Sequence, residues 1–419
     1  MHDCISFDPG VVLQGEPGPG SCISPPPPDL YHMGRFATVD DETIRRGDCT
    51  DIYFVRSDEV LLKSGKNPRL AMEVTAGALP DSRAVFCGLD DVLALLEGIP
   101  ISLDAMPEGT IFSAGDPVLR IEGYYRDFAR YETAMLGFLC HASGIATAAA
   151  YIRHLAGDRQ VYSFGSRRQH PAISRMVERA AWIGGVDGVS NTAAPPEAPL
   201  VGTMPHSFVM CYPSPEEAFQ AFDRYAPGDV PRIFLCDTFC DEKQESLAGA
   251  RTGARGVRLD TPRSRRGNMR AILEEVRWEL DAAGYPGVEI VLSGGITRAD
   301  VIAYRDIVDA FGVGGAIANA PVVDFAMDIV AIDGTPFAKR GKKSGRKQVW
   351  ELPGGSRLLM PAGDGGPEGG IPLLCPFIRD GVLVQRPSVS EARERLLASL
   401  GRIDQPVSGE PSSSLHGST

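Results

Sequence analysis

The sequence predicts an α/β protein in which repeated βα units form a parallel barrel or a doubly wound sheet. Two observations support this fold class. From residue 161 onward, short apolar segments alternate with segments of helical periodicity. Each apolar segment is followed at once by glycine or polar residues. Such residues are typical of the carboxyl ends of parallel strands, where α/β proteins bind their ligands.

The part of the chain before residue 161 predicts a tail, a small domain and a long helix. Residues 1–34 are rich in glycine and proline, and we expect a disordered tail. Residues 35–127 mix short strands and helices, which predicts an N-terminal α+β domain. Its expected strands are 51–55, 69–76, 109–112 and 118–123, the last two forming a pair, and its expected helices are 40–47 and 90–96.

The catalytic β/α domain is expected over residues 128–334. It begins with a helical region at 128–156 that is rich in small residues, where Gly144 allows close packing. Asn268 is expected to cap a later amphipathic helix. The predicted strands are 161–164, 232–236, 256–259, 288–292 and 310–313. Residues 335–405 should form a small C-terminal region with one helix at 390–397, and 406–419 a disordered tail.

The amino-acid composition indicates which partners and which cellular compartment to expect. The formal net charge of −12 argues against nucleic acid or an anionic membrane as the main partner. We find no apolar run near the roughly 18 residues that a transmembrane helix needs, and no signal peptide. The nine cysteines are scattered, so reduced cysteines in a cytoplasmic protein are the simplest interpretation.

The stretch from Ser163 to His170 is the first candidate site. Phe164 follows an apolar strand and can stack on a flat ring, while Arg167 and Arg168 can hold a carboxylate or phosphate in forked geometry. The alternative is a solvated basic loop after a core strand.

Two glycine pairs form the second candidate. Ser293-Gly294-Gly295 and Gly314-Gly315 each follow an apolar strand and precede a helix-like segment. Glycine lets backbone N–H groups approach a phosphate, and barrels commonly bind phosphate after their last two strands. Plain turns are the alternative.

Acidic residues and one histidine form the third candidate. Asp237 and Asp260 each end a strand, where carboxylates can bind sugar hydroxyls or a magnesium-bound diphosphate; helix capping is the alternative. Arg258 shares a strand face with Asp260. His206 can act as base, nucleophile or phosphate acceptor, although a lone histidine is more often structural.

Several motifs, in order over residues 35–349, resemble nicotinate phosphoribosyltransferases, above all their shorter archaeal and bacterial form. They are Thr-Asp-Ile-Tyr-Phe from Thr50, the Ser163–His170 stretch, Gly-Thr-Met-Pro-His-Ser from Gly202, Arg-Leu-Asp-Thr-Pro from Arg258, Ser-Gly-Gly from Ser293, Phe-Gly-Val-Gly from Phe311 and Lys-Arg-Gly-Lys from Lys339.

The resemblance implies the irregular parallel β/α barrel of a type II phosphoribosyltransferase. It also implies that nicotinate and phosphoribosyl diphosphate give nicotinate mononucleotide and diphosphate, with Mg²⁺ and coupled ATP hydrolysis, in NAD biosynthesis. A homodimer or higher oligomer would share its active sites. By the resemblance, Phe164, Arg167 and Asp187 would surround the ring, with Tyr53 from the other subunit; Asp51 and Arg168 are also expected to bind substrate. His206 would be phosphorylated by ATP, Arg258 and Asp260 would contact ribose and substrate, and Ser293, Gly294, Gly295, Gly314 and Gly315 would hold the 5′-phosphate. Asp237 is expected to be catalytic together with His206, Arg258 and Asp260.

The chain departs from the family pattern in its proline-rich tail, in Pro195-Pro196 and in its cysteines. Relatives often end in a cysteine-rich zinc knuckle, but Cys375 is the only cysteine after Cys240, so we expect no structural zinc. A paralogue with another aromatic acid or amide acceptor, or an inactive binding homologue, are alternatives. Quinolinate phosphoribosyltransferase is less favoured, because the His206 motif belongs to the ATP-coupled branch.

Overall fold

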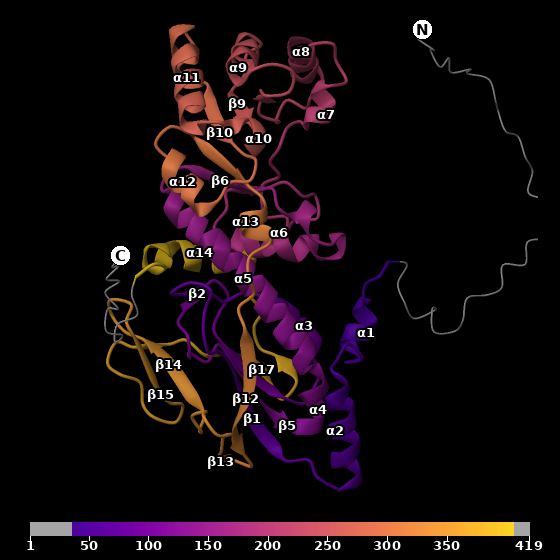
Figure 1. The fold of residues 1–419 in the computed structure, drawn as a ribbon. Helices are drawn as coiled ribbons and strands as arrows, with labels where there is room; N and C mark the ends of the chain where they lie inside the picture. The colour runs from indigo at the N-terminus through magenta and orange to yellow at the C-terminus, as the bar shows by residue number, and fades with distance from the viewer. Residues whose placement is uncertain (1–35, 406–419) are drawn as a thin grey trace, which may run out of the picture. The chain divides into compact units, whose positions relative to one another are not determined.

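The computed structural model describes residues 36–405, so the tails expected at 1–34 and 406–419 lie outside the described residues. Two sheets organise the chain from Glu42 onward (Figure 1). One is antiparallel and has seven strands, and the other is parallel and has six.

The antiparallel sheet has the strand order β13-β12-β1-β5-β3-β17-β18. Its inner strand β1 pairs with β12 on one side and β5 on the other. Because β12, β17 and β18 come from late in the chain, both ends of the sequence build this sheet. Its strands are β1 (Arg69–Ala76), β3 (Ser102–Ala105), β5 (Leu119–Tyr124), β12 (Phe325–Ile332), β13 (Thr335–Pro336), β17 (Cys375–Arg379) and β18 (Val382–Leu383).

Two expectations for the N-terminal domain are wrong. Residues 51–55 are not a strand, because helix α2 runs over Ile52–Lys63 with Asp51 at its N-cap position. The β-branched and aromatic residues of its first turn mimic a strand locally, but Phe54 alone of this helix is buried. The strands near 109–112 and 118–123 do not pair with each other: β4 (Ile111–Phe112) pairs with β2 (Ala84–Val85), and β5 pairs with β1 and β3. The expected helices are α1 (Asp41–Arg45) and α3 (Leu89–Leu96).

Helix α5 (Glu132–Ala156) is the long helix that the small residues predict. A Cβ on Gly144 would collide with the carbonyl oxygen of Pro321, so only glycine permits this approach. Together with α4 (Tyr125–Phe128) and η2 (Ala129–Tyr131), the stretch Tyr125–Ala156 is long and apolar enough to cross a membrane, contrary to our expectation. Because 72% of its most apolar window is buried inside the protein, it is a core helix.

The parallel sheet is a half-barrel with the strand order β7-β6-β11-β10-β9-β8, and helices cover it (Figure 1). The predicted strands are confirmed to within two residues at each end. The strands are β6 (Gln160–Ser163), β7 (Gly188–Val189), β8 (Ile233–Leu235), β9 (Gly256–Leu259), β10 (Glu289–Leu292) and β11 (Ala310–Val313). The helices are α6 (Ser174–Ile183), α7 (His206–Val209), α8 (Pro215–Tyr225), α9 (Glu242–Arg251), α10 (Arg263–Arg266), α11 (Met269–Ala282), which Asn268 caps, α12 (Arg298–Tyr304) and α13 (Gly315–Ala318).

We expected a separate C-terminal region after residue 334, but this segment packs against elements that precede it in the chain. Its strands β14 (Lys347–Glu351), β15 (Arg357–Pro361) and β16 (Ile371–Pro372) form a small sheet of their own. The next strands join the large antiparallel sheet, and helix α14 (Val389–Ser399) packs against α6 of the half-barrel.

Candidate active site

The six half-barrel strands run parallel, so their carboxyl ends meet at one edge. Asp237 lies two positions after the end of β8, Asp260 directly follows β9, and Phe164 directly follows β6. The glycine pairs follow β10 and β11. The topology therefore gathers at one edge the candidates that lie far apart in the sequence.

The side chain of Asp237 is hydrogen-bonded to the backbone of Asp260. Asp237 Oδ2 accepts a hydrogen bond of 2.8 Å from the Asp260 N–H, whereas Asp237 Oδ1 is buried and has no hydrogen-bond partner in the described chain. Burial raises the pKa of Asp237 to about 7, against the opposing effect of the Asp260 N–H. Asp237 is thus a buried carboxyl group with one oxygen available to a ligand.

His206 faces both of these carboxylates from the first turn of α7. Its Nδ1 lies 3.1 Å from Thr238 Oγ1 and 3.8 Å from Asp237 Oδ1, and its Nε2 lies 3.9 Å from Asp260 Oδ2. Its side chain is 40% exposed, so the imidazole remains accessible from solvent.

Arg258 connects the acidic residues to Phe164. It lies on β9, its Nη2 donates to the Met204 carbonyl over 3.0 Å, and its guanidinium carbon lies 5.8 Å from the centroid of the Phe164 ring. Burial lowers the pKa of Arg258, and the charges of Asp260 and Asp237 oppose that shift. A Cβ at Gly312 would collide with the Phe164 ring, so this glycine makes room for the aromatic side chain.

The glycine-rich turns lie beside this cluster. Gly294 and Gly295 have φ angles of +88° and +71°, which favour glycine. The turns after β6 and β11 touch, because a Cβ on Gly165 would lie 2.6 Å from the Gly314 carbonyl oxygen. The close approach of these turns therefore requires glycine at these positions.

Arg167 and Arg168 lie in the 3₁₀ turn Ser166–Arg168 and are exposed. The charge of Arg167 contributes to the lowered pKa of Arg258. In the described chain, Arg168 makes no hydrogen bond or ion pair with Asp237, Asp260 or His206.

Asp187, Asp51 and Tyr53 are not brought to the cluster within one chain. Asp187 Oδ2 binds Arg153 Nη1 at 2.6 Å and accepts the Val161 N–H at the start of β6, so its carboxylate is used in packing. Its expected place near a bound ring remains a prediction. Tyr53 is 56% exposed on α2, and its hydroxyl donates to Asp51 Oδ2.

Sequence reasoning missed Glu245, which holds the turn after β8. It is fully buried on α9, and its carboxylate accepts the backbone N–H groups of Thr238, Phe239 and Cys240. It thereby positions Thr238, the partner of His206. A carboxylate four residues into a helix has no sequence signal that distinguishes it from a surface residue.

Comparisons with known proteins identify the family of this chain. The N-terminal domain of quinolinate phosphoribosyl transferase matches residues 51–143, and the C-terminal domain matches residues 145–328. The nicotinate phosphoribosyltransferase pncB2 of Mycobacterium tuberculosis is 33% identical over 328 residues, covering 73% of this chain and 70% of the relative. The chain belongs to the type II phosphoribosyltransferase family.

Solved structures support the same fold for this phosphoribosyltransferase. A nicotinate-nucleotide pyrophosphorylase from Pyrococcus furiosus has a TM-score of 0.86 at 46% identity, covering 89% of this chain and 99% of that one. Human nicotinic acid phosphoribosyltransferase has a TM-score of 0.67 at 21% identity, covering 84% and 94%, and shows the fold alone. The α/β prediction, with an antiparallel N-terminal domain and a parallel half-barrel, is confirmed.

Proposed function

We propose that this phosphoribosyltransferase transfers the phosphoribosyl group of phosphoribosyl diphosphate to nicotinate, giving nicotinate mononucleotide and diphosphate. The observation that carries the proposal is the position of Arg258, whose guanidinium carbon lies 5.8 Å from the centroid of the Phe164 ring while the charges of Asp260 and Asp237 act on its pKa. It sets a flat stacking surface beside paired carboxylates. The names of the relatives from M. tuberculosis and Bacillus subtilis support nicotinate as the acceptor.

The proposed reaction breaks the bond between the anomeric carbon and diphosphate and forms a bond from that carbon to the pyridine nitrogen. The electron pair of the broken bond leaves with diphosphate, and the ring nitrogen supplies the new pair. Such a transfer depends on positioning and on stabilising charge rather than on proton transfer. Phe164 orients the ring, Arg167 faces its carboxylate, and Asp260 and Arg258 hold the ribose.

The residues fit a magnesium ion bound together with substrate. Asp237 Oδ1 is buried without a hydrogen-bond partner in the described chain, and both this oxygen and the Asp260 carboxylate lie within 4 Å of the His206 ring nitrogens. Mg²⁺ is commonly held by one or two carboxylates together with substrate phosphates. It would neutralise charge on the departing diphosphate. We expect no structural zinc, which remains a prediction.

His206 is the proposed link to ATP. Its position between Asp237 and Asp260, with an exposed edge, suits a side chain that accepts a phosphoryl group and then loses it to water. Hydrolysis coupled in this way would drive the transfer toward the nucleotide.

The experiment that tests the acceptor is a product assay with the purified full chain. Phosphoribosyl diphosphate is supplied with nicotinate, nicotinamide or quinolinate in parallel, with and without ATP, and the nucleotide is identified by mass. We expect nicotinate to be the preferred acceptor and ATP to raise its yield. Preference for quinolinate with carbon dioxide release, or for another aromatic acid, would replace nicotinate as the substrate, and no turnover with any acceptor would favour an inactive binding homologue.

A further inference from the structure

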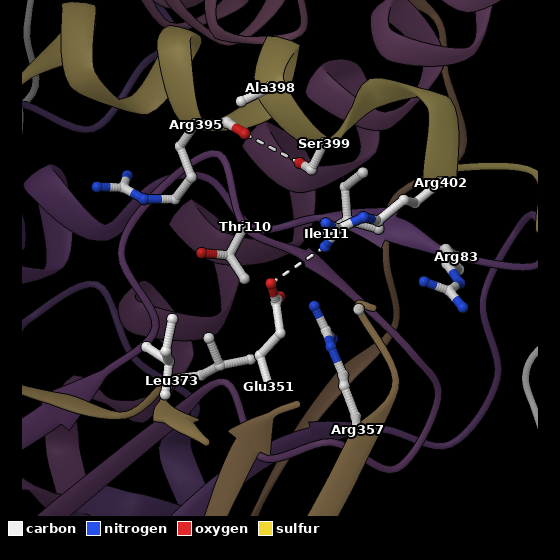
Figure 2. Close-up of a pocket in the computed structure, with 12 residues that line it drawn as sticks. Arg83, Thr110, Ile111, Glu351, Arg357, Leu373, Arg395, Ala398, Ser399 and Arg402 are labelled. Carbon is white, nitrogen blue, oxygen red and sulfur yellow. Dashed lines mark hydrogen bonds and ion pairs between the residues drawn. The ribbon is translucent and has the colours of Figure 1, made fainter. Parts of the chain in front are cut away.

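A hollow of about 270 Å³ lies away from the half-barrel edge. Strands β14 and β15, helix α14 and the segments around Arg83 and Thr110 surround it (Figure 2). It shares no lining residue with the candidate active site. Neither the proposed transfer nor the ATP step uses it.

Arginine side chains dominate this hollow. Four line it, namely Arg83, Arg357, Arg395 and Arg402, against Glu351 as the single acidic lining residue. Arg402 pairs with Glu351 at 3.1 Å. Figure 2 shows the guanidinium groups of Arg357 and Arg402 near the Glu351 carboxylate, while that of Arg395 points to the other side.

The carboxylates near the hollow do not balance these charges. Arg357 pairs with Asp116 at 2.9 Å, and Arg395 donates to the backbone carbonyl of Glu108 rather than to a carboxylate. Among the described residues, the four arginines that line the hollow therefore have two carboxylates as ion-pair partners, those of Asp116 and Glu351. In the described chain, Arg83 makes no ion pair.

The environment of Arg83 gives the strongest indication of an anion-binding site. It is 8% exposed, and its Nε is buried without a hydrogen-bond partner, as is the Nε of Arg357. Burial lowers the pKa of Arg83 and the charge of Arg357 lowers it further, while the charge of Asp116, which already pairs with Arg357, opposes the shift. A buried cation without a partner is costly, and a bound anion removes that cost.

We propose that this arginine-lined hollow is a binding site for a small multivalent oxyanion of the phosphate class, separate from the half-barrel. Guanidinium groups bind phosphate oxygens in forked geometry. Ile111, Leu373 and Ala398 form apolar walls, which strengthen these charge-assisted bonds by excluding water. The size of the hollow suits phosphate, diphosphate or a small phosphorylated metabolite.

The test is calorimetric titration of the full chain with inorganic phosphate and with diphosphate. The variants are Arg83→Gln and Arg357→Gln, and the control is Arg386→Gln, which removes the same charge from a half-exposed surface ion pair. We expect the wild type and the control to share a binding component that weakens at least about tenfold in both pocket variants.

Thermal unfolding gives an independent readout of the same site. Phosphate should raise the Tm of the wild type and of Arg386→Gln more than that of either pocket variant. If Arg83→Gln does not fold, Arg357→Gln alone decides. Titrations and Tm shifts that coincide across the wild type and the pocket variants would assign all phosphate binding to the half-barrel and overturn the proposal.

Discussion

Asp237 Oδ2 accepts the backbone N–H of Asp260 over 2.8 Å, and this bond ties the ends of β8 and β9 together. The other oxygen of the same carboxyl group is buried without a hydrogen-bond partner in the described chain. One carboxyl group therefore fixes the geometry of the site and also offers an oxygen to its ligand. Because this carboxyl group is buried, the free energy of unfolding should depend measurably on pH.

Asp237 should make the protein less stable as pH rises. Its pKa is raised from 3.8 to about 7, so between these values the unfolded chain releases a proton that the folded chain keeps. The free energy of unfolding should then fall with pH, by at most about 1.4 kcal/mol per pH unit, and level off above pH 7. Asp237→Asn should flatten this slope while abolishing activity. Thermal unfolding of both proteins at pH 5 and pH 8 provides the check, and equal slopes would show that Asp237 ionises normally in the fold.

His206→Ala should lose ATP hydrolysis and ATP stimulation, yet keep substrate binding and weak ATP-independent synthesis. The reason is that the phosphoryl acceptor disappears, whereas Phe164 and the glycine turns remain. The measurement is the ratio of ATP hydrolysed to nucleotide formed. A folded His206→Gln variant that keeps coupled ATP hydrolysis near the wild-type rate would reduce His206 to a packing role beside Thr238.

Tyr53 should act in the active site of the other subunit of a dimer. It is exposed on α2, and the resemblance to nicotinate phosphoribosyltransferases assigns its counterpart to a shared site. Co-expressed Tyr53→Ala and Arg167→Ala chains should recover about a quarter of wild-type activity. Half of randomly formed dimers are mixed, and each mixed dimer holds one intact site. Activity no higher than the mean of the two parents, or a fully active monomer, would exclude the shared site.

Glu245→Gln should displace the turn that holds Thr238. An amide cannot accept the three backbone N–H groups that the carboxylate accepts, and the loss should reduce the free energy of unfolding by about 1–3 kcal/mol. Glu274→Gln, which makes the same change in a half-exposed pair on α11, serves as the control. Denaturant unfolding compares the two, and equal stabilities would mean that the turn does not depend on this carboxylate.

The sequence predicts which residues gather at the edge of the half-barrel, because that prediction does not require the order of the strands in the sheet. Any parallel arrangement of the apolar segments brings Asp237, Asp260 and Phe164 to the same edge. The helix at Ile52 was mistaken for a strand, since its first turn is β-branched and aromatic. The roles of Asp187 and Glu245 depend on which backbone N–H groups pack against them, and local sequence does not encode that packing.

The measurement that tests the account most directly is diphosphate release from phosphoribosyl diphosphate and nicotinate by the wild type and Asp260→Asn. Asp223→Asn, which alters an exposed pair with Arg232, is the matched control. We expect nicotinate-dependent release by the wild type and the control, and a loss of at least about a hundredfold in kcat/KM for Asp260→Asn. Equal rates in all three proteins would contradict the claim that the half-barrel edge performs the transfer.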